Sequence, residues 1–312
     1  MPVRIGDSFS SPNQVSNVSV LDNDIRLDTL PEPETNAILP QASAGGHVIA
    51  RNKIEFFYQG GSVHGTDCIG GLPNFAPHGG FFSDTDVNDN MCIGATDEGI
   101  EIDGGNANIR IWGNTIRGAN MGFSITPVYH GPVYVFRNVV YNIQDHWVGS
   151  CVGVKDGEGG NGAVFFYHNT FHSPSGAGCG NVVKGFAKYG GGNAQSNVTV
   201  KNNVLHFWGR LHETGSKTFD HNLNFVEPAS GDKTSEWNGT NQWGWEAFQK
   251  GTGQEAHGLY GKATFVDAAG GDYHLAAGSA GVDGGAVLPG FNDAGSPWPF
   301  TGAAPDVGAF ER

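Results

Sequence analysis

The chain has 312 residues, including 50 glycines, and a formal net charge of −14 at neutral pH. This acidic balance disfavours a nucleic-acid partner, because phosphate binding depends on Lys and Arg side chains. No apolar stretch reaches the ~18 residues of a membrane-spanning helix, and the first residues lack the basic and apolar regions of a signal peptide.

A repeat organises the chain up to about residue 225. In each unit an asparagine has apolar residues five and three positions before it and another two positions after it. The units are centred on Asn23, Asn52, Asn90, Asn114, Asn138, Asn169 and Asn203, of which Asn52 and Asn90 fit less closely. Asn222 fits poorly, because Lys217 and Asn224 stand at apolar positions. The asparagines from Asn90 to Asn203 are 24 to 34 residues apart, which indicates coils of constant shape with loops of variable length.

Stacking is the arrangement that such a repeat favours. A lone coil of two short strands cannot bury its apolar face, whereas stacked coils bury it and pair their strands in parallel. The asparagines would then stack at one corner and satisfy buried turn amides. The repeat, including this ladder, resembles the right-handed parallel β-helix of pectate lyases, alginate lyases and related proteins over roughly residues 17–225. An antiparallel β-sandwich is the alternative, but it does not explain an asparagine at one fixed place.

The predicted fold is therefore all-β, a right-handed parallel β-helix in three parts. Residues 1–226 supply the coils, and residues 227–271 form a loop-rich segment with tryptophans and a short helix packed on the coils. Residues 272–312 resemble a C-terminal segment of bacterial β-helix proteins, through Tyr273-His274-Leu275 and Pro305-Asp306-Val307-Gly308. This resemblance implies that the segment caps the open end of the stack.

Four carboxylates lie within seven residues, at Asp97, Glu98, Glu101 and Asp103. Like charges so close together are costly unless they are solvated, protonated or shared with a cation. Calcium prefers six to eight oxygen ligands, so these residues are a candidate Ca²⁺ site. A solvated strand face with no function is the alternative.

The neighbouring coils extend this outer face. If Ile100 and Ile102 point inward, the matching inward pairs are Phe123 with Ile125, and then Val152 with Val154. The outward positions beside Asp103 then become Thr126, Lys155 and, more loosely, Lys184. Tyr129 and His130 follow in the adjacent loop, and Arg137, His146 and Trp147 are further candidates for contacts with substrate. A long groove over a parallel sheet suits an extended polymer.

The resemblance implies a carbohydrate-active protein, secreted or periplasmic in a bacterium, whose partner is a polysaccharide or oligosaccharide. It is closest to bacterial members of unassigned activity, through Asp97 to Glu101, Gly131 to Val139, Lys155 and His168-Asn169-Thr170. We expect first a polysaccharide lyase that cleaves a uronate polymer by β-elimination, with Lys155, His130 or Tyr129 as the base and Ca²⁺ on the substrate carboxylate. A glycoside hydrolase using Glu101 and Asp103 is the second expectation. A non-catalytic glycan-binding or surface β-helix is the third.

The cysteines are Cys68, Cys92, Cys151 and Cys179. None forms a close Cys-x-x-Cys pair, so a structural zinc site is not expected. The first and second pairs are separated by 24 and 28 residues, near the length of one coil. Stacked free cysteines and one or two disulfides are both compatible with this spacing, and a disulfide would favour an exported protein.

Overall fold

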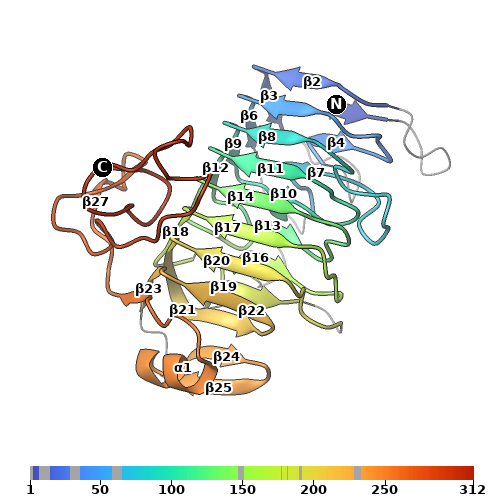
Figure 1. Cartoon of the computed structure of the whole chain (residues 1–312). Helices are drawn as coiled ribbons and strands as arrows, with labels where there is room; N and C mark the ends of the chain where they lie inside the picture. The colour runs from blue at the N-terminus through green and yellow to red at the C-terminus, as the bar shows by residue number, and fades with distance from the viewer. Residues whose placement is uncertain are drawn as a thin grey trace.

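Short parallel strands stack in successive coils over most of the chain (Figure 1). This computed structural model describes residues 3–6, 15–28, 36–57, 65–146, 151–176, 178–180, 182–189, 192–227 and 233–312. Strand pairing joins them into one 18-stranded sheet that wraps two faces of the stack and one 8-stranded sheet on a further face. The fold is thus a parallel β-helix, as the repeat predicts.

The first face is the 8-stranded sheet. Its strands are β2 (Ser19–Leu21), β5 (Val48–Ala50), β8 (Asp86–Asn88), β11 (Ile109–Trp112), β14 (Val133–Phe136), β17 (Val164–Tyr167), β20 (Val198–Lys201) and β22 (Lys217–Asp220). Ile111, Val135, Phe166 and Val200 pair in that order and in parallel. All of them are fully buried, so the predicted core of stacked inward residues is confirmed and the antiparallel sandwich is excluded.

The second face follows each first-face strand after a tight corner. Its strands are β3 (Asp24–Leu27), β6 (Lys53–Phe56), β9 (Met91–Ile93), β12 (Thr115–Arg117), β15 (Val139–Tyr141), β18 (Thr170–Ser173), the first half of β21 (Val204–Thr214), β23 (Leu223–Glu227) and β26 (Leu259–Tyr260).

The third face is made of β1 (Val3–Ile5), β4 (Ile38–Pro40), β7 (Ile69–Gly70), β10 (Glu98–Glu101), β13 (Met121–Ile125), β16 (Cys151–Asp156), β19 (Val183–Lys188), the second half of β21 and β24 (Lys233–Trp237).

An asparagine ladder holds the corner between the first and second faces. In each coil the backbone N–H and the side-chain amide of one asparagine donate to Oδ1 of the next, at 3.0 and 2.9 Å from Asn90 to Asn114. Asn222 belongs to the ladder despite its poor sequence fit, because it accepts both bonds from Asn203. The ladder ends on the buried carboxyl of Glu255, which accepts from the backbone and side chain of Asn222.

A stacked column of glycines shapes the third face. Gly99, Gly122, Gly153 and Gly185 hold matching places in successive coils, and a β-carbon on Gly122 would lie 2.5 Å from the Gly153 carbonyl oxygen and 2.9 Å from the Val140 side chain. Side chains from the second face therefore fill the space that a larger residue would need. We call these four residues the glycine column.

The cysteines form the disulfides Cys68–Cys92 and Cys151–Cys179. Both pairs are the ones whose separations match one coil. In the first pair the bridge crosses the interior between the third and second faces, since Cys68 precedes β7 and Cys92 lies in β9. Of the two arrangements compatible with the sequence, the protein thus has the one with two bridges.

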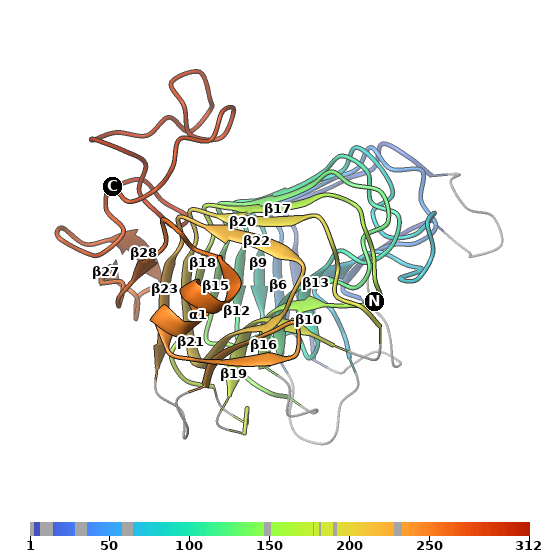
Figure 2. The same cartoon turned by 60° about the horizontal axis from the view of Figure 1, so that its bottom comes forward.

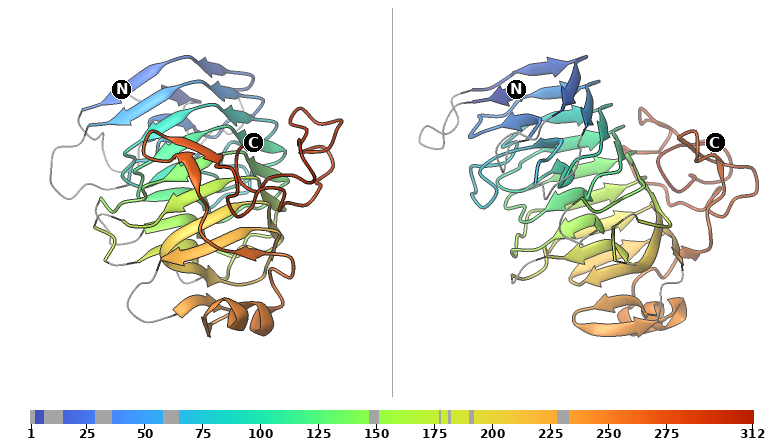
Figure 3. Two further views of the ribbon diagram at one scale, coloured as in Figure 1. Left: turned by 90° about the vertical axis from the view of Figure 1, so that its left-hand side faces the viewer. Right: turned by 180° about the vertical axis from the view of Figure 1, so that it is seen from behind.

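The last coil is covered by residues 233–253, and the C-terminal tail lies elsewhere. Helix α1 (Trp245–Thr252) lies across the end of the stack with β24 and its antiparallel partner β25 (Thr240–Trp243), and buries Phe248 against His212 and Trp237 (Figure 2). The tail, with the hairpin β27 (Phe265–Asp267) and β28 (Asp272–Leu275), runs along the side of several middle coils (Figure 3). The expected cap at 272–312 is corrected accordingly, because the tail has aromatic anchors such as Trp298 that fit the side of the stack.

Candidate active site

Carboxyl groups converge on the third face. Oxygen atoms of Asp67, Glu98 and Glu101 all lie within 4.8 Å of one another, and the three residues are buried. Asp67 stands one coil before Glu98, because Ile69 pairs with Ile100. We call Asp67, Asp97, Glu98, Glu101 and Asp103 the carboxyl cluster. Asp67 was missed in the sequence, although its place 31 residues before Glu98 is the separation of one coil.

The glycine column explains why Glu98 and Glu101 share one side of the sheet. Strict alternation would place residues three apart on opposite sides. Gly99 and Ile100 both face the interior, since a β-carbon on Gly99 would meet the Ile116 side chain and Ile100 is in the core. The residues on either side of this inward pair, Glu98 and Glu101, are thereby both turned outward.

Lys155 pairs with a different residue of the neighbouring coil than the sequence predicts. Phe123 pairs with Val154, and Ile125 pairs with Asp156, whereas the sequence prediction matched Phe123 with Val152. Lys155 consequently lies beside Ser124, whose other neighbour is Glu101, and not beside Thr126. This shift of two residues brings the Lys155 amine into an ion pair with the Glu98 carboxylate.

Polar contacts fix the remaining carboxyls. The Ser124 hydroxyl donates to Asp103 at 2.7 Å, and the backbone N–H of Thr126 donates to the same oxygen. The Asn74 side-chain amide, in the loop that follows β7, donates to Glu101 at 2.6 Å. Each of these carboxyls is thus held in one orientation.

Burial and crowding divide the carboxyls into protonated and ionised groups. Burial, with the charges of Asp103 and Glu98, raises the pKa of Glu101 to about 8. Burial, with the charge of Glu98, likewise raises the pKa of Asp97 to about 9 and that of Asp103 to about 7. Burial alone would raise the pKa of Glu98 too, but the Lys155 charge and hydrogen bonds from Asp67 and Asp97 hold it below its ordinary value. Burial and crowding thus favour the protonated form of Glu101, and the Lys155 charge favours the ionised form of Glu98.

Unpartnered polar atoms border the cluster. The Asn36 Nδ2 and Thr126 Oγ1 atoms are buried without a hydrogen-bond partner among the described residues. A β-carbon at Gly70 would lie 2.5 Å from Asn36 Nδ2 and 2.9 Å from Glu101 Oε2, so these two polar atoms share the space that Gly70 leaves. Donors and acceptors left in this way suit a polar ligand such as a sugar hydroxyl or a cation's water.

The donor set also fits a calcium ion. Carboxylate oxygens are the ligands that Ca²⁺ prefers, and Asp67, Glu98 and Glu101 offer them at one place. Of the expected ligands, Asp97 and Asp103 are near enough to raise the pKa of their neighbours but are not part of this closest group. A cation here would compete with the Lys155 amine for Glu98.

Other expected residues lie outside the cluster. Tyr129 and His130 contact the backbone carbonyls of Phe75 and Pro77, in the loop that also carries Asn74. Lys184 pairs in register with Val152 and forms an ion pair of 2.9 Å with Glu213, so it does not continue the line from Asp103.

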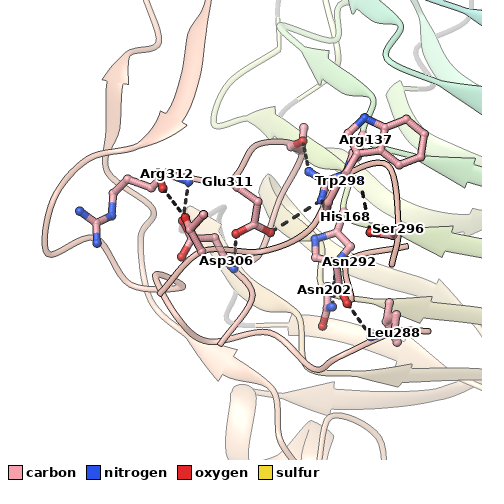
Figure 4. Close-up of polar contacts among 12 residues, drawn as sticks. Arg137, His168, Asn202, Leu288, Asn292, Ser296, Trp298, Asp306, Glu311 and Arg312 are labelled. Carbon is pink, nitrogen blue, oxygen red and sulfur yellow. Dashed lines mark hydrogen bonds and ion pairs between the residues drawn. The ribbon is translucent and has the colours of Figure 1, made fainter. Parts of the chain in front are cut away.

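Arg137 and His146 are on other surfaces. The Arg137 guanidinium is 9% exposed and donates to the carbonyls of Ala309 and Trp298, so it anchors the tail (Figure 4). His146 contacts the Gly118 carbonyl beside the second face, where it lines a cavity of about 360 Å³. That Arg137 and His146 bind substrate stays a prediction, and Trp147 lies outside the described residues.

Compared with protein families, with curated proteins and with solved structures, the chain matches none of them. The described part of the chain has no helix with the length and hydropathy needed to cross a membrane.

Proposed function

We propose that the protein cleaves glycosidic bonds of an extended polysaccharide at the carboxyl cluster, by acid and nucleophile catalysis. The observation that supports this most is that Glu98 and Glu101 meet beside the Lys155 amine, which pairs with Glu98 alone of the two. Burial and crowding raise the pKa of Glu101 while Lys155 lowers that of Glu98. Glycoside hydrolysis needs such a pair, one carboxyl to protonate the leaving oxygen and one to act as a carboxylate.

We propose a double displacement, because oxygens of the two carboxyls come close to each other. Retaining glycosidases place their two carboxyls about 5–5.5 Å apart, and oxygens of Glu98 and Glu101 lie within 4.8 Å. Glu101 gives its proton to the glycosidic oxygen while Glu98 attacks the anomeric carbon. Glu101 then takes a proton from the water that displaces the sugar from Glu98. Lys155 keeps Glu98 ionised, and the pair Glu98 and Glu101 replaces the Glu101 and Asp103 pair expected from sequence.

A lyase is the second candidate, because Lys155 is part of the cluster. Burial alone would lower the pKa of Lys155, but the charge of Glu98 and its neighbours raises it well above the ordinary value, which is unsuitable for a base. A calcium ion held by Asp67, Glu98 and Glu101 would neutralise those charges and the substrate carboxylate. Lys155 would then lose its proton more readily and abstract the proton beside a uronate carboxylate.

A panel of polysaccharides separates these functions, with calcium and with chelator. New reducing ends without ultraviolet absorbance from unsaturated uronates support hydrolysis, and reducing ends with that absorbance support the lyase. Glu101→Gln should abolish hydrolysis by orders of magnitude. Glu213→Gln is the matched control, since this carboxyl also faces a lysine on the third face. If the wild type cleaves no polymer, both enzymatic functions are contradicted and a non-catalytic, glycan-binding role is the remaining candidate.

The finer features of the fold belong to the same proposal. We infer right-handed coils, because parallel crossovers have this hand in nearly all proteins, and a relationship to the pectate and alginate lyase superfamily. The two disulfides support an exported location, because such bonds persist in oxidising compartments.

A further inference from the structure

A second group of metal-binding side chains lies at the far end of the stack from the N-terminus. Asp220 ends β22, His221 occupies the corner before the ladder residue Asn222, and His257 follows helix α1. Their ligand atoms all lie within 4.8 Å of one another. The group is well separated in the chain from the carboxyl cluster and contains two imidazoles, so its chemistry is different.

One oxygen of the Asp220 carboxylate accepts a backbone hydrogen bond, and the other faces the two imidazoles. The N–H of His257 donates to Asp220 Oδ1 at 2.8 Å, which fixes the carboxylate. The other oxygen, Oδ2, lies 3.0 Å from His257 Nδ1 and 3.1 Å from His221 Nδ1. Ligand atoms about 2.0–2.1 Å from a tetrahedral zinc ion are about 3.3 Å apart, so these separations are close to two edges of such a site.

The rings of His221 and His257 lie together next to Asp220. They lie face to face, with centroids 4.7 Å apart and an angle of 24° between the planes. Both Nδ1 atoms approach the same Asp220 oxygen, so the rings need to turn only enough to aim their in-plane lone pairs at a shared ion. The Nδ1 atom of His221 is buried and has no hydrogen-bond partner among the described residues, although the Asp220 oxygen is near. Two ring nitrogens that meet at one carboxylate oxygen form a donor set that can bind a cation.

We propose that Asp220, His221 and His257 bind a divalent transition-metal ion of the zinc type. Two neutral imidazoles and one carboxylate are a donor set that Zn²⁺ accepts and that Ca²⁺, which prefers oxygen, does not. The His257 side chain is 67% exposed, which leaves the fourth position open to water.

The ion would fasten the segment that ends the asparagine ladder. Glu255 donates its backbone N–H to the Phe219 carbonyl and Leu259 donates to the Asn222 carbonyl, each at 2.8 Å, so residues 255–259 lie along the last coil. A metal bridging His257 to Asp220 and His221 holds this segment in place and stabilises the folded state by mass action.

Calorimetric titration of the folded protein with Zn²⁺, in saturating Ca²⁺ to occupy oxygen sites, tests the proposal. We expect one tight equivalent in the wild type, a weakening of at least about 100-fold in His257→Ala, and a similar loss in Asp220→Asn. His274→Ala is the matched control, because His274 is exposed and pairs with Asp272 at 2.7 Å but has no second imidazole in that pair.

Cobalt gives a second readout. Co²⁺ added to the wild type should develop the visible absorbance of a tetrahedral site with nitrogen ligands, and His221→Ala should abolish it while the melting temperature without metal stays nearly unchanged. Zinc affinity that is equal in the wild type and His257→Ala, or that falls equally in His274→Ala, would overturn the proposal.

Discussion

Asp156 and Lys217 lie inside the stack with no exposed side-chain area, and their charged groups are 2.5 Å apart. The backbone N–H of Gln195 also donates to Asp156, and the Lys217 amine donates to the Gln195 carbonyl, so this pair is matched in charge and in hydrogen bonds. The carboxyl cluster differs, because in the described part of the chain several acids lie around one amine, that of Lys155. The buried Asp156–Lys217 pair is balanced in charge, whereas the carboxyl cluster has more acids than amines. This excess of acids indicates a functional site.

Buried histidines make stability depend on pH at the residue scale. Burial, with the charge of Lys217, lowers the pKa of His212 to about 3, while the unfolded chain has a pKa near 6.5. Between these values the unfolded state binds more protons, so stability is complete above about pH 6.5 and falls as the pH drops toward 3. His212→Leu should flatten this acid limb of the melting temperature measured against pH.

His274→Leu is the control for that series, since the His274 side chain is 47% exposed. Its acid limb should stay steeper than that of His212→Leu. An unchanged acid limb in His212→Leu would show that this imidazole is not buried as a neutral group.

At the scale of elements, the glycine column lets two consecutive residues of a strand face the interior, which turns Glu98 and Glu101 to the same side. Gly122→Ala places a methyl group 2.5 Å from the Gly153 carbonyl oxygen, and backbone on one side and Val140 on the other leave no room to relax. We expect a loss of about 1–3 kcal/mol in the free energy of unfolding, as for other overpacked cores, measured by denaturant titration.

Gly295→Ala is the matched control, because among the described residues no atom outside its chain neighbours lies within 4 Å of the point where its β-carbon would stand. Its free energy of unfolding should stay within about half a kcal/mol of the wild type. Equal stabilities of the two variants would contradict the close approach of neighbouring coils at Gly122.

The repeat predicted the strands and the core because each coil repeats the same apolar spacing around its asparagine. It did not predict the register of Lys155, since alternation assumes a regular strand and the Gly99 and Gly153 positions each bring two consecutive residues inward. Asp67 was missed because it is isolated in the sequence and meets Glu98 only after stacking. The roles of Arg137 and the tail depend on contacts more than 160 residues apart, for which the local pattern contains no signal.

At the scale of the whole molecule, the two disulfides connect neighbouring coils of the stack. Cys68–Cys92 closes a separation of 24 residues. Restricting such a loop in the unfolded chain contributes about 3 kcal/mol in the chain-entropy description. The double variant Cys68→Ala with Cys92→Ala should lose about that much in denaturant unfolding, or more where the smaller side chains leave a cavity.

Reductant should lower the stability of the wild type and have a smaller effect on the double variant, which retains Cys151–Cys179. A wild type whose unfolding is insensitive to strong reductant under unfolding conditions would contradict the presence of these bonds.

The division of charge between Glu98 and Glu101 is tested most directly by NMR titration of their side-chain carboxyl carbons, assigned with Glu98→Gln and Glu101→Gln. We expect Glu101 to titrate near pH 8 and Glu98 below its ordinary value. Because the two groups interact, the midpoints describe the pair, and Lys155→Met should raise the lower one. Ordinary midpoints for both carboxyls, near about pH 4.3, would contradict the proposed acid and nucleophile.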